Sequence, residues 1–392
     1  MPQQRVLPRR ELNMERPPPG SLLIKPVSAR CNLRCRYCFY RDRPRDPYQS
    51  QGSGRIMSDE VLTALVGQFL GMPNAISNFC WQGGEPLLAG HDFFERVFER
   101  ENALGKGGQR VANAIQTNGT LIDDRFAELF ARYRVFIGLS LDGPEKLHDL
   151  NRVDAEGRGT HRLVMEAAKL LERHGVEFNI LSVVTAVGAG RAAEIYSFLL
   201  SQGFHYLQFI PDIERGNAEG GPAPHSVSAR AFGAFLCDLF DAWHENGRPR
   251  ASIRFFDNVM EALQGHPPGA CSLQKTCADY VVVEYTGDVY PCDFLVESDW
   301  LLGNIMEKPL GEILRAPRWE EFLKIKPNLP RACRRCEYRL LCRGGCPYDR
   351  LMAGSLSRPP LLCEGYRMFF DHAAEKLLII ARHFTARRLN TP

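Results

Sequence analysis

Short apolar runs alternate with amphipathic stretches along residues 21–250 of this chain. The apolar runs predict six strands, at residues 21–28, 74–82, 111–119, 134–143, 177–185 and 206–212. Apolar residues that recur every three to four positions predict helices at residues 58–71, 91–102, 123–133, 161–175, 191–203 and 228–246, with Ser58 as a plausible N-cap. Repeated strand–helix units predict parallel strands with right-handed crossovers, in a doubly wound or barrel-like α/β fold.

Four further segments lie outside residues 21–250, and each has a different pattern of apolar, polar and cysteine residues. Residues 1–20 hold basic residues and prolines without an apolar core, which predicts a flexible N-terminal arm rather than a secretory signal. Residues 251–270 resemble a connector, and residues 271–366 form a cysteine-dense, arginine-rich domain that starts with short strands. Residues 367–392 predict an amphipathic C-terminal helix with a basic end, which we expect to pack on the domain surface.

The composition narrows the class of protein. The 392 residues are 44% hydrophobic and 24% charged, as in soluble globular proteins. The net charge of +3 is too small to indicate a nucleic-acid or membrane partner. No apolar run approaches the roughly 20 residues that cross a bilayer. We therefore expect a cytoplasmic protein with neither kind of partner.

Thirteen cysteines are distributed unevenly along the chain. Three lie within residues 31–38, eight lie between residues 271 and 363, and only Cys80 and Cys237 stand alone. A reducing cytosol and the length of the chain disfavour a disulfide framework, whereas clustering indicates metal binding. The two isolated cysteines are most simply small buried apolar residues.

The first cysteine group has an open position. Cys31, Cys35 and Cys38 form a CxxxCxxC motif on the loop after the first strand, and three thiolates leave one place of a four-ligand site unfilled. A zinc site completed by His91 or His148 is the alternative. Polar motifs also follow the next three strands, namely GGEP, TNGT and SLDG. Barrels place their active sites at these strand ends, which favours a partial (β/α)6 TIM-like barrel.

This stretch resembles the signature loop of the radical S-adenosylmethionine (SAM) enzymes, with Tyr37 as the aromatic residue before the third cysteine. The resemblance implies a [4Fe–4S] cluster on the three cysteines, whose open iron binds the amino and carboxylate groups of SAM. The SAM-binding residues that it implies are Tyr37 near the adenine, Gly83, Gly84 and Glu85 at the amino group, and Asn118, Ser140 and Arg152 at the ribose or carboxylate.

The eight later cysteines follow a second spacing. Cys277-x9-Gly287-x4-Cys292, followed by CRRCEYRLLCRGGC and Cys363, resembles the SPASM domain of peptide- and protein-modifying radical SAM enzymes. The resemblance implies two auxiliary [4Fe–4S] clusters. Their ligands would be Cys271, Cys277, Cys292 and Cys346 for one, and Cys333, Cys336, Cys342 and Cys363 for the other. The spacing alone leaves two zinc ions as an alternative.

Further motifs lie along residues 21–370, namely CFY with Tyr40, Gln82 before GGEP, SLDGP with HD downstream, YLQFIP (206–211), PCD (291–293) and GGCP-x-DR (344–350). Together they resemble the anaerobic sulfatase-maturating enzymes. The resemblance implies a radical SAM oxidoreductase that forms a 5′-deoxyadenosyl radical and converts a Cys or Ser of a sulfatase C/S-x-P-x-R segment into Cα-formylglycine. It also implies a flavodoxin- or ferredoxin-type reductant, and auxiliary clusters that accept the second electron. Asp293 would be the base, and Tyr40 and Gln82 would line the substrate pocket. Tyr348 and Asp212 depart from this resemblance, since relatives often have Lys and Cys there.

Two other functions stay open at this point. One is a SPASM enzyme that crosslinks or epimerises another ribosomal peptide, although residues 1–20 are too short for the winged peptide-binding domain that such enzymes often carry. The other is a non-catalytic iron–sulfur carrier or zinc protein, which would have no use for GGEP, Ser140 and Arg152 around the first cysteines.

Overall fold

One mixed sheet organises the computed structural model, which describes residues 17–41, 45–48, 55–214 and 223–389. The strand order is β10-β9-β8-β1-β2-β3-β4-β5-β6-β7. The six predicted strands are present as parallel neighbours. They are β1 (Ser21–Lys25), β2 (Ile76–Trp81), β3 (Arg110–Thr117), β4 (Phe136–Ser140), β5 (Phe178–Val184) and β6 (Tyr206–Pro211). The expected α/β partial barrel is therefore confirmed.

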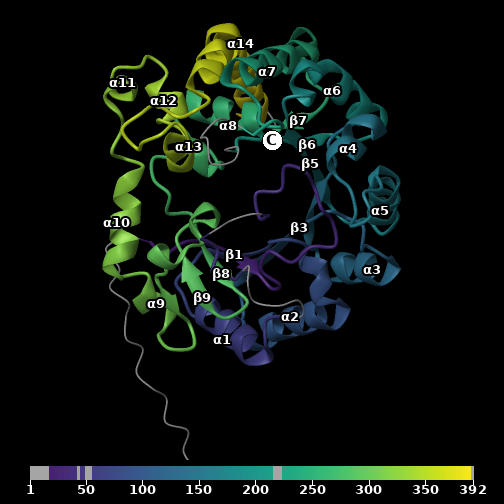
Figure 1. The fold of residues 1–392 in the computed structure, drawn as a ribbon, viewed down its shortest axis with the longest axis vertical. Coiled ribbons are helices and arrows are strands. Elements are labelled where there is room, and N and C mark those ends of the chain that lie inside the picture. Colours follow the sequence, from purple (N-terminus) through teal and green to yellow (C-terminus); the bar gives the residue numbers. More distant parts are fainter. Residues whose placement is uncertain (1–16, 42–44, 49–54, 215–222, 390–392) are drawn as a thin grey trace, which may run out of the picture.

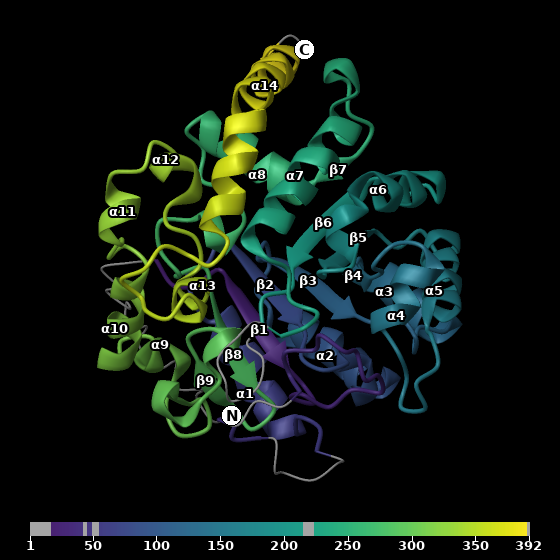
Figure 2. The same cartoon turned by 45° about the horizontal axis from the view of Figure 1, so that its top comes forward.

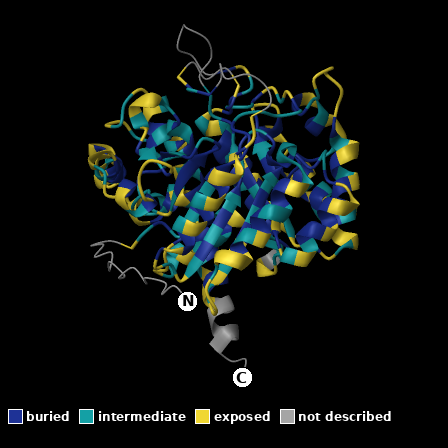
Figure 3. Cartoon of the chain, turned by 90° about the horizontal axis from the view of Figure 1, so that it is seen from below, coloured by how far each residue is buried: buried dark blue, intermediate teal, exposed yellow. Residues whose placement is uncertain are grey.

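Helices surround the curved sheet (Figure 1). The predicted helices are α1 (Asp59–Leu70), α2 (His91–Leu104), α3 (Asp124–Tyr133), α5 (His161–Arg173), α6 (Ala192–Ser201) and α7 (Ala229–His244), and the short α4 (Glu145–Asn151) is additional. Ser58 caps α1 as predicted, because its side chain accepts a hydrogen bond from the Val61 amide. Short 3-10 helices lie at Pro86–Ala89, Gly188–Gly190, Glu245–Gly247, Cys271–Leu273, Asp293–Leu295 and Ser298–Trp300. Exposed residues gather on the outer faces of the helices, and buried residues on the strands (Figure 3).

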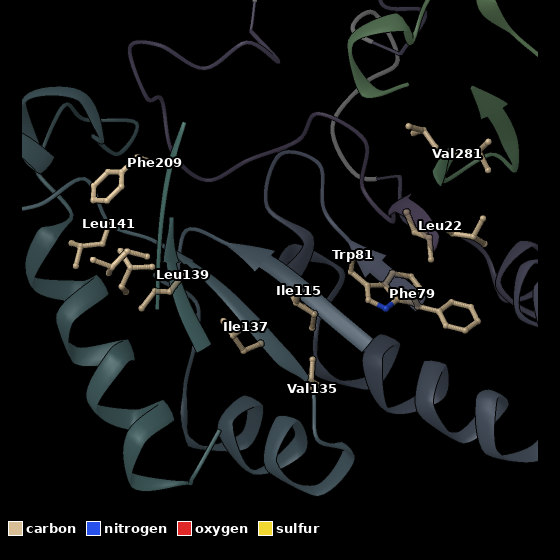
Figure 4. Close-up of a cluster of buried hydrophobic side chains, with 14 of the residues drawn as sticks. Leu22, Phe79, Trp81, Ile115, Val135, Ile137, Leu139, Leu141, Phe209 and Val281 are labelled. Atoms are coloured by element: carbon tan, nitrogen blue, oxygen red, sulfur yellow. The ribbon is translucent and has the colours of Figure 1, made fainter. Parts of the chain in front are cut away.

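Rows of apolar side chains across the strands fill the layer between sheet and helices (Figure 4). The register places Leu22 of β1 between Phe79 of β2 and Val281 of a later strand. Trp81 and Ile115 are neighbours in the same way. Burial of a Leu or Phe side chain contributes about 1.5–3 kcal/mol, so these rows hold the strands in register.

The structure extends the sheet at both edges of the predicted barrel. Residues 251–270, expected as a connector, contain β7 (Ser252–Ile253), which pairs with β6, and α8 (Arg254–Leu263), which packs on β6. At the other edge, β8 (Tyr280–Glu284) pairs with β1 in parallel, and β9 (Asp288–Tyr290) and β10 (Gly303–Asn304) continue antiparallel. The cysteine-rich region is thus built onto the first barrel strand.

The C-terminal region consists of short helices and one long helix. The short ones are α9 (Leu310–Ile313), α10 (Pro317–Ile325), α11 (Arg331–Arg334), α12 (Arg339–Cys342) and α13 (Pro347–Met352). The long helix α14 (Cys363–Leu389) starts four residues before the predicted boundary and lies along α7 and α8 (Figure 2). A Cβ atom at Gly365 would overlap the Ala229 carbonyl oxygen, so a glycine permits this close helix crossing. Among the described residues, no helix is long and apolar enough to cross a membrane.

We predict that Phe369→Ala in α14 lowers the thermal unfolding midpoint clearly. The Phe369 ring is 0% exposed and stacks on Phe256 at 5.3 Å between centroids, and truncation of such a ring costs about 3–5 kcal/mol. Ile379→Ala on the same helix is the matched control, because Ile379 is 49% exposed. Equal shifts in the two variants would show that α14 does not stabilise the barrel through this face.

Candidate functional site

The loop after β1 carries the first three cysteines and is fixed by backbone hydrogen bonds. The Arg34 amide donates to the Val153 carbonyl at 2.7 Å, and the Arg36 amide donates to the Asn151 carbonyl at 2.9 Å. Burial raises the pKa of the Cys31 thiol to about 12, and the other two thiols lie near enough to interact with it electrostatically. Buried thiols of this kind are readily ionised only by a bound cation, so the loop fits a metal cluster.

The GGEP turn after β2 packs directly on this loop. The Gly84 amide donates to the Ser28 carbonyl, and the Glu85 amide donates to the Arg30 carbonyl, both at 2.8 Å. A Cβ atom on Gly83 or Gly84 would overlap these same carbonyls, and Gly83 has a φ of 122°. The two glycines are therefore required by the close approach of the two loops.

Glu85 is fully buried beside the first cysteine. Its carboxylate accepts hydrogen bonds from the Thr117 hydroxyl and the Asn118 amide, both at 2.8 Å. Burial raises its pKa to about 7. The Asn118 side chain also reaches the Cys31 sulfur at 3.7 Å. The GGEP and TNGT motifs thus meet at the cysteine loop, as the resemblance implies.

A second buried charge lies on the other side of the loop. Arg152 forms an ion pair with Asp142 at 3.1 Å, and the Tyr37 hydroxyl donates to the same carboxylate at 2.5 Å. Asp142, in SLDG, was not among the predicted site residues, although its motif was noted. Ser140 ends β4 nearby and accepts a hydrogen bond from Gln116 at 3.0 Å. Tyr37, Asn118 and Arg152 therefore lie at or beside the cysteine loop, and Ser140 lies two residues before Asp142.

The two histidines of the zinc alternative have other partners. His148 is buried and bonds the Asp142 amide and the Thr160 hydroxyl, and His91 bonds Asp123 at 2.9 Å. The charges of the segment EKLHD predict a solvated helix face; Glu145 and Lys146 are exposed, as this predicts, whereas His148 is buried. In the part of the chain that the structure describes, no three His, Cys, Asp or Glu side chains converge on one ion. The thiolates of a four-iron cluster bind different irons, so they need not converge in this way.

Asp293 lies in a buried network of charges at the end of β1. Its carboxylate forms an ion pair with Lys25 at 2.5 Å and accepts a hydrogen bond from the Tyr40 hydroxyl at 2.5 Å. Lys25 also pairs with Glu284 at 3.4 Å and lies 4.7 Å from the centre of the Tyr40 ring. Lys25, Glu284 and Asp293 are 1%, 0% and 5% exposed. Burial raises the pKa of Glu284 to about 7.

Lys25 and Glu284 are functional candidates that sequence reasoning missed. The available signal was a charged residue at the end of two apolar runs, SLLIK and YVVVE. An aromatic wall adjoins the network, since Phe294 stacks on Tyr348 at 4.3 Å between centroids. Gln82 is half-buried, and its backbone amide donates to the backbone carbonyl of Ile24.

The later cysteines gather in the two groups that the resemblance implies. Cys271 interacts electrostatically with Cys277, Cys292 and Cys346. The second group lines one cavity of about 80 Å³, and its members are Cys333, Cys336, Cys342 and Cys363. Each group offers four thiols, the number that a [4Fe–4S] cluster takes.

Two buried cations accompany these groups. The Lys326 ammonium donates to the Cys271 and Ser272 carbonyls at 2.7 and 2.8 Å. Arg350 is 0% exposed and donates to the Gly344 carbonyl at 2.9 Å. It interacts electrostatically with cysteines of both groups. Such cations offset the negative charge of buried thiolates.

Cys80 and Cys237 lie apart from the three groups. Both are half-buried, Cys80 in β2 and Cys237 in α7. The Cys237 sulfur lies 3.9 Å from the Met368 carbonyl oxygen of α14. Both were expected to be buried, so the structure leaves them more exposed than the sequence predicts.

Comparisons with known proteins agree with this geometry. A family model of the radical SAM superfamily matches residues 26–191, and a model described as an iron–sulfur cluster-binding domain matches residues 271–337. A cysteine-type anaerobic sulfatase-maturating enzyme of Clostridium perfringens is 38% identical over 93% of this chain and 99% of its own. A serine-type enzyme of Bacteroides thetaiotaomicron is 34% identical over 91% of this chain and 90% of its own.

A solved structure is also similar to this chain. Native anSMEcpe with bound AdoMet and the Kp18Cys peptide superposes with a TM-score of 0.86 at 38% identity, over 93% of this chain and 99% of that chain. Relatives this similar over nearly their whole length share the fold. The chain therefore belongs to the anaerobic sulfatase-maturating enzymes, within the radical SAM superfamily.

Proposed function

We propose that this protein oxidises a Cys or Ser of a sulfatase, within a C/S-x-P-x-R segment, to Cα-formylglycine. The observation that carries the proposal is the buried network of Asp293, Lys25 and Tyr40. Tyr40 belongs to the loop of the three-cysteine group, so a proton acceptor lies beside the place where a radical would form. An electron carrier or a zinc protein would need no such acceptor.

The cofactors would be three [4Fe–4S] clusters and SAM. When bound, the first cluster and SAM supply a 5′-deoxyadenosyl radical that takes a hydrogen atom from the substrate Cβ. The first cluster would be held by Cys31, Cys35 and Cys38, and SAM by Tyr37, Gly83, Gly84, Glu85, Asn118, Ser140 and Arg152. The two later cysteine groups would hold the auxiliary clusters that accept the second electron.

Residues of this chain would accept the proton that the substrate loses. Asp293 would take it from the substrate hydroxyl or thiol as the carbonyl or thiocarbonyl forms. The two carboxylate oxygens have different partners, since one contacts the Lys25 ammonium and the other accepts the hydrogen bond of the Tyr40 hydroxyl. These partners would fix the orientation of the carboxylate, and burial would keep water from the radical.

We propose a cytoplasmic location and a flavodoxin- or ferredoxin-type reductant. A reducing compartment keeps the cysteines available for clusters, and one-electron carriers match the one-electron steps of the reaction.

The first prediction concerns the reaction itself. The reconstituted enzyme, incubated anaerobically with SAM, dithionite and a peptide containing C/S-x-P-x-R, should convert the CH2SH or CH2OH side chain into CHO. Mass spectrometry of the peptide, with a matched peptide carrying Ala at the target position as control, measures this. Unchanged target peptide alongside 5′-deoxyadenosine would indicate a maturase of another peptide, and absence of 5′-deoxyadenosine would refute a radical SAM enzyme.

The second prediction concerns the base. Asp293→Asn should still cleave SAM but lower the rate of aldehyde formation by about 100-fold or more, because the proton acceptor is lost. The readout is the amount of formylglycine per 5′-deoxyadenosine. Asp299→Asn, an exposed residue of the same segment, is the control and should behave like wild type. Wild-type yield from Asp293→Asn would dismiss the base assignment.

The third prediction concerns Lys25. Lys25→Met removes the cation between two buried carboxylates, so Asp293 should lose its orientation and aldehyde per SAM cleaved should fall by about tenfold. Lys25→Arg keeps the charge and should restore part of that ratio. Iron content monitors folding in both variants. Equal ratios in Lys25→Met and wild type would rule out a positioning role.

A further inference from the structure

A basic surface covers the second group of later cysteines. Residues 331–343, which we call the α11–α12 surface, hold five arginines against one glutamate, a net charge of +4. The whole chain carries only +3, so positive charge is concentrated here rather than spread evenly. Arg331, Arg335 and Arg339 are exposed, and Leu340 beside them is 62% exposed.

Acidic residues next to this surface already have partners. The one glutamate, Glu337, lies 3.8 Å from Arg367 of α14. Asp371 accepts a hydrogen bond from the Tyr338 hydroxyl. The five arginines of residues 331–343 and Arg367 outnumber the two carboxylates, Glu337 and Asp371, so the charge around the exposed Leu340 side chain stays positive.

The surface lies directly over the cysteine cavity. Arg339 and Arg367 line that cavity together with Cys333, Cys336, Cys342 and Cys363. In Figures 1 and 2, α11 and α12 lie at the outer edge of the molecule. A cluster held there would be the one nearest to a partner that docks from outside.

We infer that the α11–α12 surface is the docking site of an acidic one-electron carrier protein of the flavodoxin or ferredoxin type. The inference rests on the proposed function, in which the substrate radical gives up one proton and one electron. A Ser substrate then yields the aldehyde directly, and a Cys substrate yields a thioaldehyde that water hydrolyses to the aldehyde and hydrogen sulfide. The proton goes to Asp293. The electron leaves through the later cysteine groups and reduces the oxidised carrier by one electron, which balances the step.

The chemistry of the surface fits such a partner. Electron-transfer complexes are small and transient, and complementary charge speeds their formation and fixes their orientation. An apolar centre with a charged rim is the usual anatomy of an interface. Leu340 supplies the centre, and the arginines supply a rim that an acidic surface would match.

The test measures binding of a purified acidic flavodoxin to the reconstituted holoenzyme by calorimetry, at about 50 and 300 mM salt. Wild-type affinity should fall about tenfold or more at the higher salt. Arg331→Glu/Arg335→Glu should bind about tenfold more weakly at low salt, with a flatter salt dependence. Leu340→Ala should weaken binding about threefold with an unchanged salt dependence.

The matched control is Arg162→Glu/Lys169→Glu, which changes the net charge equally on exposed positions of α5. It should bind within about twofold of wild type. Equal weakening in both double variants, no weakening in Arg331→Glu/Arg335→Glu, or no binding by wild type would overturn the inference. Arg331→Gln/Arg335→Gln, with about half the effect, keeps the test valid if the charge reversal impairs cluster assembly, which iron content reports.

The aldehyde assay with dithionite as reductant tests the proposed function without any carrier protein. It therefore distinguishes a failure of this inference from a failure of the proposed function. Arg331→Glu/Arg335→Glu should match wild type in that assay, because no carrier protein takes part in it and small-molecule electron donors and acceptors need no docking surface. If wild type forms the aldehyde but flavodoxin binding does not depend on the arginines of the α11–α12 surface, only the docking inference is refuted. If binding depends on these arginines but wild type forms no aldehyde, only the proposed function is refuted.

Discussion

The parallel pairing of β8 with β1 is the contact on which the site depends. It is the only place in the described ladder where the cysteine-rich region joins the barrel sheet, and its register sets Lys25 opposite Glu284. The chain then turns through β9 and returns with Asp293, whose carboxylate meets the same ammonium. A slip of β8 by one residue would turn the Glu284 side chain to the other face of the sheet, away from Lys25. The apolar row that includes Leu22 and Val281 opposes such a slip.

Buried charge is the recurring cost of this architecture, and the structure offsets it locally. Each cysteine region has a cation beside it: Arg152 near the first, Lys326 near the second and Arg350 between the two later groups. An isolated buried charge is expensive, so each of these cations needs an opposite charge nearby. Asp142 supplies it for Arg152, and Asp349 supplies part of it for Lys326 and Arg350. Ionised thiolates of the later cysteine groups would supply the rest, so these two cations fit cluster-bound thiolates.

The sequence carries the local features of this fold and few of its long-range contacts. Strand and helix positions follow from periodicity, and the cysteine groups follow from spacing, because both signals lie within short segments. Periodicity does not say which strands pair, so the β1–β8 contact and the β7–α8 extension of the barrel could not be derived. Lys25 was missed for the same reason, since its partners lie far along the chain. The burial of His148 could not be derived either, because its helix is too short to show an apolar stripe.

The proposed proton acceptor and electron acceptor are neighbours along the chain, since Asp293 directly follows Cys292. Oxidation of a substrate radical to an aldehyde removes one proton and one electron, and a site that removes only one of them would leave a charge buried beside the substrate. With the two acceptors joined by one peptide bond, the substrate can meet both at once. The proton and the electron then leave the substrate in different directions. The proton goes to Asp293, which Lys25 and Tyr40 hold in place. The later cysteine groups instead lead outward, past Arg350, to the α11–α12 surface.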